Sequence, residues 1–327
     1  MRKDRLKVVV TDYDYPSIDL EEGMITEVGF DFQAGHAKTE DEVIAIASEA
    51  DGVIAQYAPM TERVLESLPR CKVISRYGVG LDNVDVEAAT RRGIMVCNAP
   101  RYCVNEVSNH AIALMLALSR KVVVANAEIR RGIWDAIGLA PIMDPAAQVV
   151  GVAGLGNIGR TFVKKVLALG HPCIAYDPYK EESLFRSLGV ERVDLEALLR
   201  RADMISLHTS LTRETYHMIG EKELSMMRPT AFLINTSRGK VVDQKALYRA
   251  LKEGKIAGAA LDVLEEEPPK KDDPLLSLDN LILTPHLAFY SDDSIKRLRT
   301  TVVDSVIQVL RGETPEYIAN PDVLKRR

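Results

Sequence analysis

Short apolar runs alternate with amphipathic stretches along most of the chain. In the first hundred residues the apolar runs are KVVV (7–10), GVIA (52–55), KVIS (72–75) and GIMV (93–96). The stretches that carry apolar residues at helical spacing between them are 40–50, 61–68 and 84–92. Continuous apolar runs suit strands buried on both faces, and strands that alternate with helices form mostly parallel sheets. This part of the chain therefore predicts a parallel βα unit.

A second series of the same kind begins near residue 148. Its expected strands are 148–153, 172–176, 204–208, 231–235, 258–263 and 280–284, and a last helix is expected over 291–310. The segment 104–120 is helix-like and apolar on most of its circumference, which predicts a helix buried between domains or subunits. His110 on this helix is expected to be a packed or interfacial histidine. Residues 121–147 show no clear strand signal.

These patterns predict an α/β protein with two doubly wound parallel-sheet domains. A single large sheet is the less favoured alternative, because residues 104–147 separate the two series. The length of 327 residues also favours two domains, since single hydrophobic cores stop growing near roughly 250–300 residues.

The composition is that of an ordinary globular protein. Hydrophobic residues make up 46% and charged residues 27%, which excludes disordered and low-complexity classes. The formal net charge of −5 gives no overall basic field for nucleic acid or an anionic membrane, so we expect neither as a partner.

The cysteines and the apolar runs indicate the cellular compartment of the protein. Cys71, Cys97, Cys103 and Cys173 include no C-x-x-C pair, and so few cysteines in a long chain cannot form a disulfide framework. The N-terminal residues lack the features of a secretory signal, and the strongest apolar run, 111–118, is too short to span a bilayer. We expect a cytoplasmic protein without a metal site.

The sequence GLGNIG, which starts at Gly154, matches the pattern G-x-G-x-x-G between an expected strand and an expected helix. Gly154 permits the tight turn, Gly156 lets the backbone approach a pyrophosphate, and Gly159 allows close packing of helix and strand. Asn157 and Ile158 open the helix, whose free N–H groups and positive dipole end would face the phosphates. The loop therefore predicts a dinucleotide site.

Asp177 ends the next expected strand, about 20 residues beyond the loop, where this fingerprint places an acid on the adenosine ribose. Its charge would also repel a 2′-phosphate, which predicts NAD rather than NADP as the cofactor. The alternative is a glycine-rich turn that binds no ligand. Strand, loop, helix and acid all agree with the fingerprint, so we favour NAD.

Five sequence blocks resemble those of the D-isomer-specific 2-hydroxyacid dehydrogenases over nearly the whole chain. These blocks are residues 76–100, 154–160, 234–243, 258–268 and 283–291. The last block and the Asp-Pro-Tyr that begins at Asp177 are also similar to the C-terminal-binding-protein branch, which includes transcriptional co-repressors.

The resemblance implies an interleaved layout. Residues 1–100 and 290–327 would form a flavodoxin-like substrate domain, and residues 101–289 would form a Rossmann NAD-binding domain. It also implies a homodimer that pairs through the NAD-binding domains, and the apolar segment 104–120 suits such an interface.

Arg238, Glu267 and His286 each follow an expected strand of the second series. Open parallel sheets bind ligands beyond the carboxyl ends of their strands, so these side chains can converge. Arginine pairs bidentately with a carboxylate, and histidine exchanges a proton near neutral pH. The resemblance makes Arg238 the group that orients the substrate carboxylate and His286 the proton donor. Glu267 would fix the tautomer of the imidazole and favour its charged form.

Each of the three residues has a plain structural alternative. Arg238 could cap a turn, and His286 could be a structural histidine. Glu267 belongs to the acidic run Glu265–Glu267, which could be a solvated loop. Only the family motif, in which the acid directly precedes Pro268, selects Glu267 among them.

The turn Gly78-Val79-Gly80 is the expected cradle for the substrate carboxylate. Consecutive backbone N–H groups in a glycine turn form an anion-binding nest, although an ordinary βα turn is the alternative. Arg76 and Tyr57 end neighbouring strands of the first series and would shape the choice of substrate.

By resemblance, Thr209, Thr236 and Asp262 would contact NAD, with Asp262 accepting a hydrogen bond from the nicotinamide amide. Two residues depart from the commonest family pattern: Ser210 stands where a proline is frequent, and Lys240 replaces a second glycine after Arg-Gly. Neither departure removes a catalytic group.

The resemblance predicts an oxidoreductase that transfers a hydride between NADH and a small 2-keto acid or D-2-hydroxy acid. Glyoxylate, hydroxypyruvate, pyruvate and 3-phosphoglycerate all remain open as substrates. A co-repressor-like scaffold that binds NAD is the alternative from a different functional class. A formate- or phosphite-type dehydrogenase is a third hypothesis.

Overall fold

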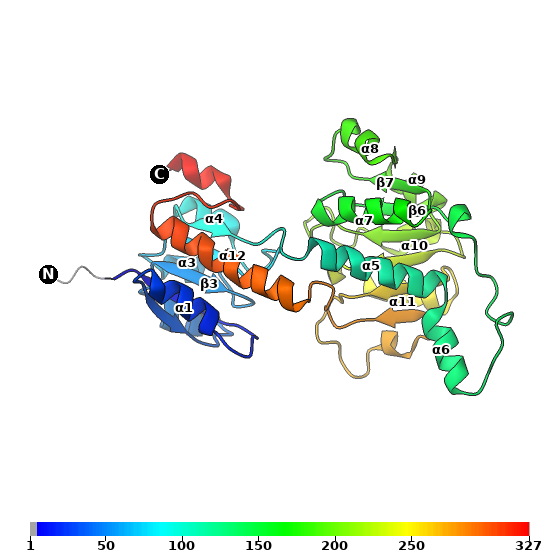
Figure 1. The fold of residues 1–327 in the computed structure, drawn as a ribbon, viewed down its shortest axis with the longest axis horizontal. Coiled ribbons are helices and arrows are strands. Elements are labelled where there is room, and N and C mark those ends of the chain that lie inside the picture. Colours follow the sequence, from blue (N-terminus) through cyan, green and yellow to red (C-terminus); the bar gives the residue numbers. More distant parts are fainter. Residues whose placement is uncertain (1–4, 327) are drawn as a thin grey trace. The chain divides into compact units, whose positions relative to one another are not determined.

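The chain divides into two compact units in the computed structural model, which describes residues 5–326 (Figure 1). We call Met1–Tyr102 together with Ser291–Arg327 unit 1, and Cys103–Tyr290 unit 2. Unit 2 is thus inserted into unit 1. The chain passes between the units after Tyr102 and again after Tyr290.

Unit 1 contains a 5-stranded parallel sheet in the order β2-β1-β3-β4-β5, which is the flavodoxin-like order. Its strands are β1 (Lys7–Val10), β2 (Asp31–Ala34), β3 (Gly52–Ala55), β4 (Val73–Arg76) and β5 (Met95–Cys97). The register places Val9 of β1 between Gln33 of β2 and Val53 of β3.

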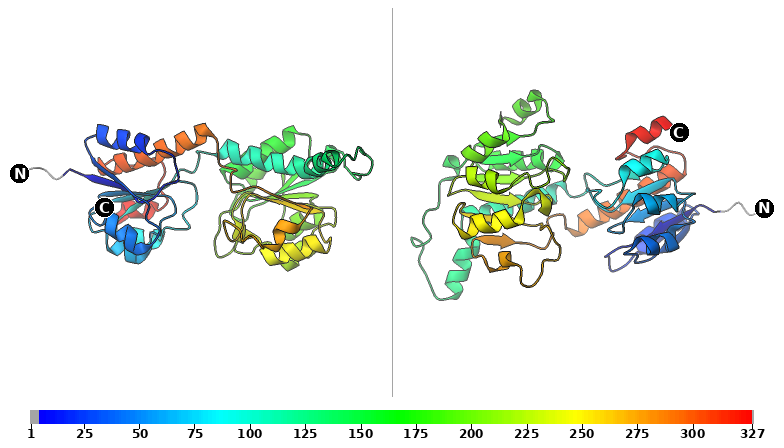
Figure 2. Two further views of the ribbon diagram at one scale, coloured as in Figure 1. Left: turned by 90° about the horizontal axis from the view of Figure 1, so that it is seen from below. Right: turned by 180° about the vertical axis from the view of Figure 1, so that it is seen from behind.

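Helices cover both faces of the sheet of unit 1 (Figure 2). One face carries α2 (Glu40–Ala47), α3 (Glu62–Glu66) and α4 (Val86–Arg91). The other face carries α1 (Asp19–Glu27) and α12 (Asp292–Leu310), which lie side by side. Ser291 caps α12 by accepting a hydrogen bond from the Ser294 N–H, and a Cβ at Gly52 would lie 2.7 Å from Val306, so α12 packs closely on β3.

Unit 2 contains a 7-stranded parallel sheet in the order β12-β11-β10-β9-β6-β7-β8. Its strands are β6 (Val150–Ala153), β7 (Cys173–Tyr176), β8 (Glu191–Arg192), β9 (Met204–Leu207), β10 (Phe232–Asn235), β11 (Gly258–Leu261) and β12 (Leu281–Leu283). The chain enters at β6, winds outwards to β8 and returns to the other side at β9. This is the Rossmann order, and its switch point lies between β6 and β9.

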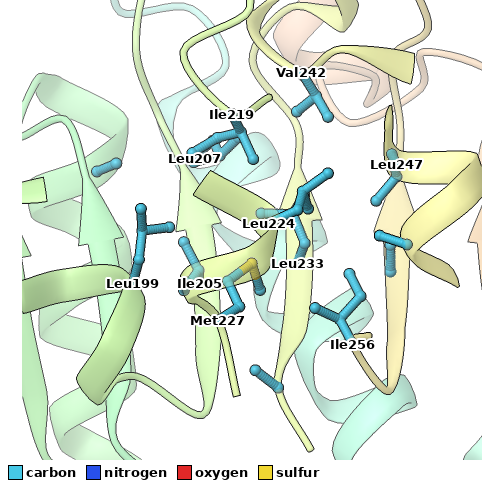
Figure 3. Packing of buried hydrophobic residues seen from close by; sticks show 14 of the residues in the cluster. Leu199, Ile205, Leu207, Ile219, Leu224, Met227, Leu233, Val242, Leu247 and Ile256 are labelled. Atoms are coloured by element: carbon cyan, nitrogen blue, oxygen red, sulfur yellow. The ribbon is translucent and has the colours of Figure 1, made fainter. Parts of the chain in front are cut away.

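Two apolar layers enclose this second sheet. One face carries α5 (Val104–Ser119), α7 (Asn157–Ala168) and α8 (Glu182–Leu188). The other carries α9 (Leu195–Arg201), α10 (Glu221–Met226) and α11 (Gln244–Lys252). Figure 3 shows Leu224 and Leu247 among the buried side chains of this face, together with Ile205 and Leu233 of the strands. The short 3-10 helices are η1 (Pro145–Ala147), η2 (Gly239–Val241), η3 (Pro274–Ser277) and η4 (Pro321–Arg326).

The prediction of two doubly wound parallel sheets is confirmed. The sequence pattern missed β2 and β8, which are edge strands with mostly exposed or half-buried residues and therefore no continuous apolar run. It also missed α6 (Val122–Arg130), a helix on which no residue is buried. Among the described residues, none of the helices combines the length and the hydrophobicity that crossing a membrane requires.

Helix α5 is buried as predicted, but against its own unit. Ala111, Leu114 and Met115 pack with Phe162 of α7 and Ile234 of β10. The burial of these side chains is therefore explained inside unit 2, and an interface between domains or subunits on this helix stays a prediction. A run of exposed apolar side chains follows this helix: Val122, Val123, Val124, Ile129, Ile133, Trp134, Ile137 and Met143.

Candidate active site

The glycine loop after β6 is shaped by two close backbone approaches. Gly154 has a φ of +95°, and a Cβ there would lie 2.7 Å from the His208 carbonyl oxygen. A Cβ at Gly159 would lie 2.0 Å from the Gly154 carbonyl oxygen, whereas a Cβ at Gly156 would meet nothing within 4 Å. Gly154 and Gly159 therefore keep the turn tight, and the backbone at Gly156 faces open space, as a pyrophosphate requires.

Helix α7 begins directly after this loop. Gly156 is its N-cap and offers no side chain to the first N–H groups of the helix. Asn157 and Ile158 occupy the first two helical positions, where N–H groups have no partner within the helix and the dipole end is positive. The helix end is therefore suited to an anion.

Asp177 lies beside the same loop, just beyond β7. One carboxylate oxygen accepts a hydrogen bond from the Leu155 N–H at 2.8 Å, and the other accepts from the Tyr179 N–H at 3.0 Å. Because each carboxylate oxygen can accept more than one hydrogen bond, Asp177 is held in place and can still accept from a ribose hydroxyl.

Two hydroxyl groups at this edge of the sheet are buried without a hydrogen-bond partner among residues 5–326: Oγ1 of Thr209 and Oγ1 of Thr236. Thr209 follows β9 and Thr236 follows β10. A buried hydroxyl without a partner destabilises a fold by about 1–3 kcal/mol, so a ligand that supplies the partners suits both positions. Together with the open space at Gly156, these hydroxyls show that the carboxyl edge of this sheet fits NAD.

His286 and Glu267 form a hydrogen-bonded pair beyond β12 and β11. Nδ1 of His286 lies 2.7 Å from one Glu267 oxygen, and the other oxygen accepts from the Leu264 N–H at 2.8 Å. Nε2 of the imidazole has no partner within the described part of the chain. His286 also adopts a φ of +50°, which non-glycine residues seldom do outside functional sites.

The charge state of Glu267 follows from its surroundings. Burial raises the pKa of Glu267, but hydrogen bonds from His286 and the Leu264 N–H, and the nearby charges of His286 and Arg238, lower it more. The net pKa of Glu267 lies below its ordinary value. Glu267 is therefore a carboxylate at neutral pH, close enough to Arg238 for the two charges to interact.

The three neighbouring acids, Glu265 to Glu267, have different partners in the structure. Glu265 lies 3.1 Å from Nε2 of His217, and Glu266 lies 3.4 Å from Nζ of Lys270. Only Glu267 hydrogen-bonds to His286. Glu265, which the sequence left as a candidate for a solvated loop, instead anchors the loop, because it also accepts from the Gln244 N–H at 2.8 Å.

Gly239 brings Arg238 next to the acidic loop. A Cβ at Gly239 would lie 1.9 Å from the Leu264 carbonyl group, so only glycine allows the two backbones to meet. The two departures from the family pattern lie at exposed positions. The side chain of Lys240 is exposed, and its carbonyl accepts from the His217 N–H at 2.8 Å. Ser210 is exposed as well.

Asp262 supports the loop that carries His286. It is buried, and its carboxylate accepts from Thr284 Oγ1 at 2.6 Å and from the N–H groups of Leu287 and Ala288 at 2.9 Å each. Nε2 of His110 lies 3.0 Å from Thr284 Oγ1. His110, which the sequence predicted only as a packed histidine, therefore joins the network behind His286. A lone histidine on an apolar helix gives no sequence signal for this role.

His208 is a second residue that sequence reasoning passed over. Its ring packs on Phe162 with ring centroids 4.8 Å apart, and its Nε2 lies 2.9 Å from Oγ of Ser206. Burial lowers the pKa of His208 to about 3. A neutral imidazole therefore lies under the glycine loop.

The substrate residues predicted in unit 1 lie at the carboxyl edge of its own sheet. The Gly78 carbonyl accepts from the Ala99 N–H at 2.9 Å and the Val79 carbonyl accepts from Asn98 Nδ2 at 2.7 Å. The N–H groups of Gly78, Val79 and Gly80 donate no hydrogen bond within residues 5–326. The turn therefore has its carbonyls tied down and its donors available, as an anion nest requires.

Arg76 and Tyr57 flank this turn. A Cβ at Gly78, whose φ is +135°, would lie 2.1 Å from Nη1 of Arg76, so the guanidinium rests on the turn itself. Nε of Arg76 donates to the Gln56 carbonyl at 3.1 Å. The side chain of Tyr57 is exposed.

A buried cluster stands behind the turn. The hydroxyl of Tyr77 donates to the fully buried Glu21 at 2.9 Å, and Nε of Arg299 donates to the same carboxylate at 2.7 Å. Cζ of Arg299 lies 4.8 Å from the ring centroid of Tyr15. Helices α1 and α12 are thereby joined to the residue that directly precedes Gly78.

Known proteins match this arrangement. Residues 112–288 match the family model for the NAD-binding domain of D-isomer-specific 2-hydroxyacid dehydrogenases. A glyoxylate reductase of Korarchaeum cryptofilum is 43% identical over 290 residues, 87% of each chain. A D-3-phosphoglycerate dehydrogenase of Methanocaldococcus jannaschii is 42% identical over 96% of this chain and 59% of its own length. The crystal structure of a D-lactate dehydrogenase from Aquifex aeolicus, complexed with NAD and lactic acid, aligns with a TM-score of 0.85 at 30% identity, covering 96% of this chain and 99% of that chain.

The family model lies within unit 2, which holds the glycine loop and the His286–Glu267 pair, while the relatives align over much more of the chain. Motifs, geometry and relatives thus agree. The chain belongs to the D-isomer-specific 2-hydroxyacid dehydrogenase family and is an NAD-dependent oxidoreductase.

Proposed function

We propose that the protein reduces a small 2-keto acid to the D-2-hydroxy acid. The observation that carries the proposal is the His286–Glu267 pair, which leaves Nε2 of the imidazole available. Bound NADH supplies the hydride. The protonated Nε2 gives its proton to the keto oxygen as the keto carbon gains the hydride, so an alcohol and a neutral imidazole result.

The charged residues around this pair receive separate roles. Glu267, whose pKa lies below its ordinary value, stays anionic and stabilises the imidazolium. Arg238 pairs with the substrate carboxylate and polarises the keto oxygen, because guanidinium keeps its charge and binds carboxylates bidentately.

We assign substrate binding to unit 1, the substrate domain. Its turn Gly78–Gly80 would receive the substrate carboxylate, and Arg76 and Tyr57 would act on the rest of the molecule. The support is that the three N–H groups of the turn have no acceptor among the described residues and that Arg76 rests on it.

We assign NAD binding to unit 2 and prefer NAD to NADP. The glycine loop and the end of α7 would hold the pyrophosphate, Asp177 the adenosine ribose, and Thr209 and Thr236 further polar groups of the cofactor. Asp262 would act mainly by fixing the loop of His286, since its carboxylate already accepts three hydrogen bonds.

The substrate proposed first is glyoxylate or the closely related hydroxypyruvate. The glyoxylate reductases of Korarchaeum cryptofilum and similar organisms align over most of both chains, whereas this chain covers 59% of the phosphoglycerate dehydrogenase. The relatives cited are named as enzymes, so they give the co-repressor-like alternative no support.

A turnover assay tests the proposal. NADH oxidation is followed with glyoxylate, hydroxypyruvate, pyruvate and 3-phosphohydroxypyruvate at equal concentrations, with Arg238→Gln as the matched inactive control. We expect the highest kcat/KM for glyoxylate or hydroxypyruvate. If kcat/KM were highest for 3-phosphohydroxypyruvate, that acid would replace glyoxylate as the assigned substrate. If none of these acids were turned over, the proposal would be overturned.

We also propose a cytoplasmic homodimer that pairs through unit 2. Trp134 and Ile137, with exposed fractions of 88% and 84%, lie in the apolar stretch that follows α5, and exposed apolar surface of this kind marks interaction sites. All four cysteines are buried free thiols, which suits a reducing compartment.

A further inference from the structure

A cavity of about 460 Å³ lies in unit 1, beside both segments through which the chain passes between the units. Its walls come from Ala99, Arg101 and Tyr102, from the first half of α12 and from Tyr317. The chain leaves unit 1 after Tyr102 and re-enters it at Ser291, just before α12. None of the lining residues belongs to the substrate or cofactor residues assigned above.

The lining of this cavity carries a net positive charge. Arg101, Lys296 and Arg297 contribute cations, whereas Asp293 is the single carboxylate among the lining residues. Lys296 has no ion pair or hydrogen bond within the described residues, so its charge is available to a ligand. An anion is therefore favoured in the cavity and a cation is disfavoured.

The two guanidinium groups are held at the walls. Nε of Arg297 donates to the Tyr102 carbonyl at 3.0 Å, which joins the two connecting segments directly. Nη1 of Arg101 lies 4.0 Å from a Glu316 oxygen, at the outer limit of an ion pair, and its Cζ lies 6.0 Å from the ring centroid of Tyr317. These contacts place both guanidinium groups at the walls of the cavity, where an oxyanion can accept charge-assisted hydrogen bonds from them.

The remaining lining residues include two tyrosines and two threonines. Tyr102 is buried and Tyr317 is half-buried, so their rings offer a surface on which a flat or aliphatic group can pack. The hydroxyls of Thr300 and Thr301 donate no side-chain hydrogen bond within the described part of the chain. The chemistry suits a molecule with a small apolar body and a carboxylate or phosphate group.

We propose that this cavity binds a small organic oxyanion at a site distinct from the substrate's. Arg101, Lys296 and Arg297 would bind the anionic group, and Tyr102 and Tyr317 would pack on the apolar body. Because the site is built from both connecting segments, its ligand ties these segments together and acts on the enzyme through them rather than through the reacting atoms.

Phenyl phosphate and inorganic phosphate serve as probes, titrated calorimetrically into the protein saturated with NAD⁺, so that the cofactor site is filled. Four proteins are compared: the wild type, Arg101→Gln/Lys296→Gln in the cavity, Arg238→Gln in the catalytic site, and Lys38→Gln/Arg63→Gln. The last pair removes the same charge from unit 1 at exposed positions outside the cavity. Melting temperatures establish that each variant is folded.

We expect phenyl phosphate to bind more tightly than inorganic phosphate, because only its ring can use the tyrosines. Arg101→Gln/Lys296→Gln should weaken binding by about tenfold or more, since two charge-assisted contacts are lost. Arg238→Gln and Lys38→Gln/Arg63→Gln should leave the affinity unchanged. Three outcomes would each overturn the proposal. The cavity variant could bind phenyl phosphate as tightly as the wild type, binding could be lost only in Arg238→Gln, or the wild type could show no saturable binding.

Discussion

At the scale of single residues, the site is defined by which hydrogen-bonding atoms are already engaged. Both oxygens of Glu267 and of Asp262 accept hydrogen bonds from the protein, and these bonds fix the loops. The hydroxyls of Thr209 and Thr236, by contrast, have no partner among residues 5–326. Groups that build the framework are thus different from groups left for a ligand.

The proton-donor role of His286 gives the first prediction. His286→Ala should lower kcat for keto-acid reduction by about 10²–10⁴-fold, the usual range for general acid catalysis, and leave the Kd for NADH nearly unchanged. Stopped-flow kinetics and fluorescence titration measure the two quantities. A loss of NADH affinity in parallel with kcat would show that the imidazole holds the cofactor instead.

The pH profile tests Glu267 in the same pair. The contact that lowers the pKa of Glu267 also favours the protonated imidazole. Glu267→Gln should therefore move the alkaline limb of reduction to lower pH, because the imidazolium loses its anionic partner. Glu266→Gln, a neighbouring acid paired with Lys270, is the matched control and should keep the wild-type profile. A limb that stays in place, or moves to higher pH, would remove Glu267 from this role.

Cofactor choice is also a property of one residue. Asp177→Ala should narrow the ratio of kcat/KM with NADH to kcat/KM with NADPH, because the charge that repels a 2′-phosphate is lost. Glu181, an exposed acid four residues later in the sequence, provides the control, and Glu181→Ala should leave the ratio unchanged. Equal use of both cofactors by the wild type would contradict the assignment.

The buried His208 links a single residue to the stability of unit 2. Its folded pKa of about 3 lies below the ordinary value of roughly 6.5, so the unfolded chain binds the proton first. The contribution of the neutral imidazole is complete above about pH 6.5 and is lost as the pH falls towards 3. The free energy of unfolding of the wild type should therefore fall between pH 7.5 and pH 5. In His208→Asn, which has no imidazole at this position, the fall should be smaller by up to roughly 2 kcal/mol. Urea titrations at both pH values measure the difference, and parallel losses would refute it.

At the scale of elements, the periodicity of apolar residues predicted the buried strands well and the edges poorly. Continuous runs such as 52–55 and 204–207 are buried on both faces, and their pattern is therefore unmistakable. The strands β2 and β8 lack that burial, and α6 has no buried face. Motifs likewise pointed to Glu267 and His286, which the structure brings into one hydrogen-bonded pair. His110, His208 and Tyr77, by contrast, make contacts between distant elements, which a single sequence does not reveal.

The buried cluster of Tyr77, Glu21 and Arg299 next to the turn Gly78–Gly80, the proposed substrate site, yields a prediction about such contacts. Tyr77→Phe removes the hydroxyl that reaches Glu21, while Arg299 still pairs with that carboxylate. One hydrogen bond contributes about 0.5–1.5 kcal/mol, so we expect KM for the keto acid to rise about 2–10-fold with kcat and NADH affinity little changed. Tyr248→Phe, in α11 of unit 2, is the matched control. A lower melting temperature without any change in KM would make the role of Tyr77 purely structural.

At the scale of the whole molecule, the exposed apolar stretch after α5 predicts self-association. Sedimentation at micromolar concentration should show a dimer, and Trp134→Ser/Ile137→Ser should shift it towards the 36 kDa monomer. Leu276→Ser removes one exposed apolar side chain elsewhere in unit 2 and should leave the dimer intact. A wild type that sediments only as the monomer would refute the prediction.

The insertion of unit 2 into unit 1 has a consequence for synthesis on the ribosome. The segment Cys103–Tyr290 is continuous and can fold as soon as it emerges, whereas unit 1 lacks α12 until all of unit 2 has been made. Until then one face of its five-stranded sheet has only α1 to cover it, and the apolar side chains that meet Val302 and Val306 are exposed to water. Nascent chains that stall before residue 291 should therefore be the species that chaperones hold and that aggregate, although their larger unit is already complete.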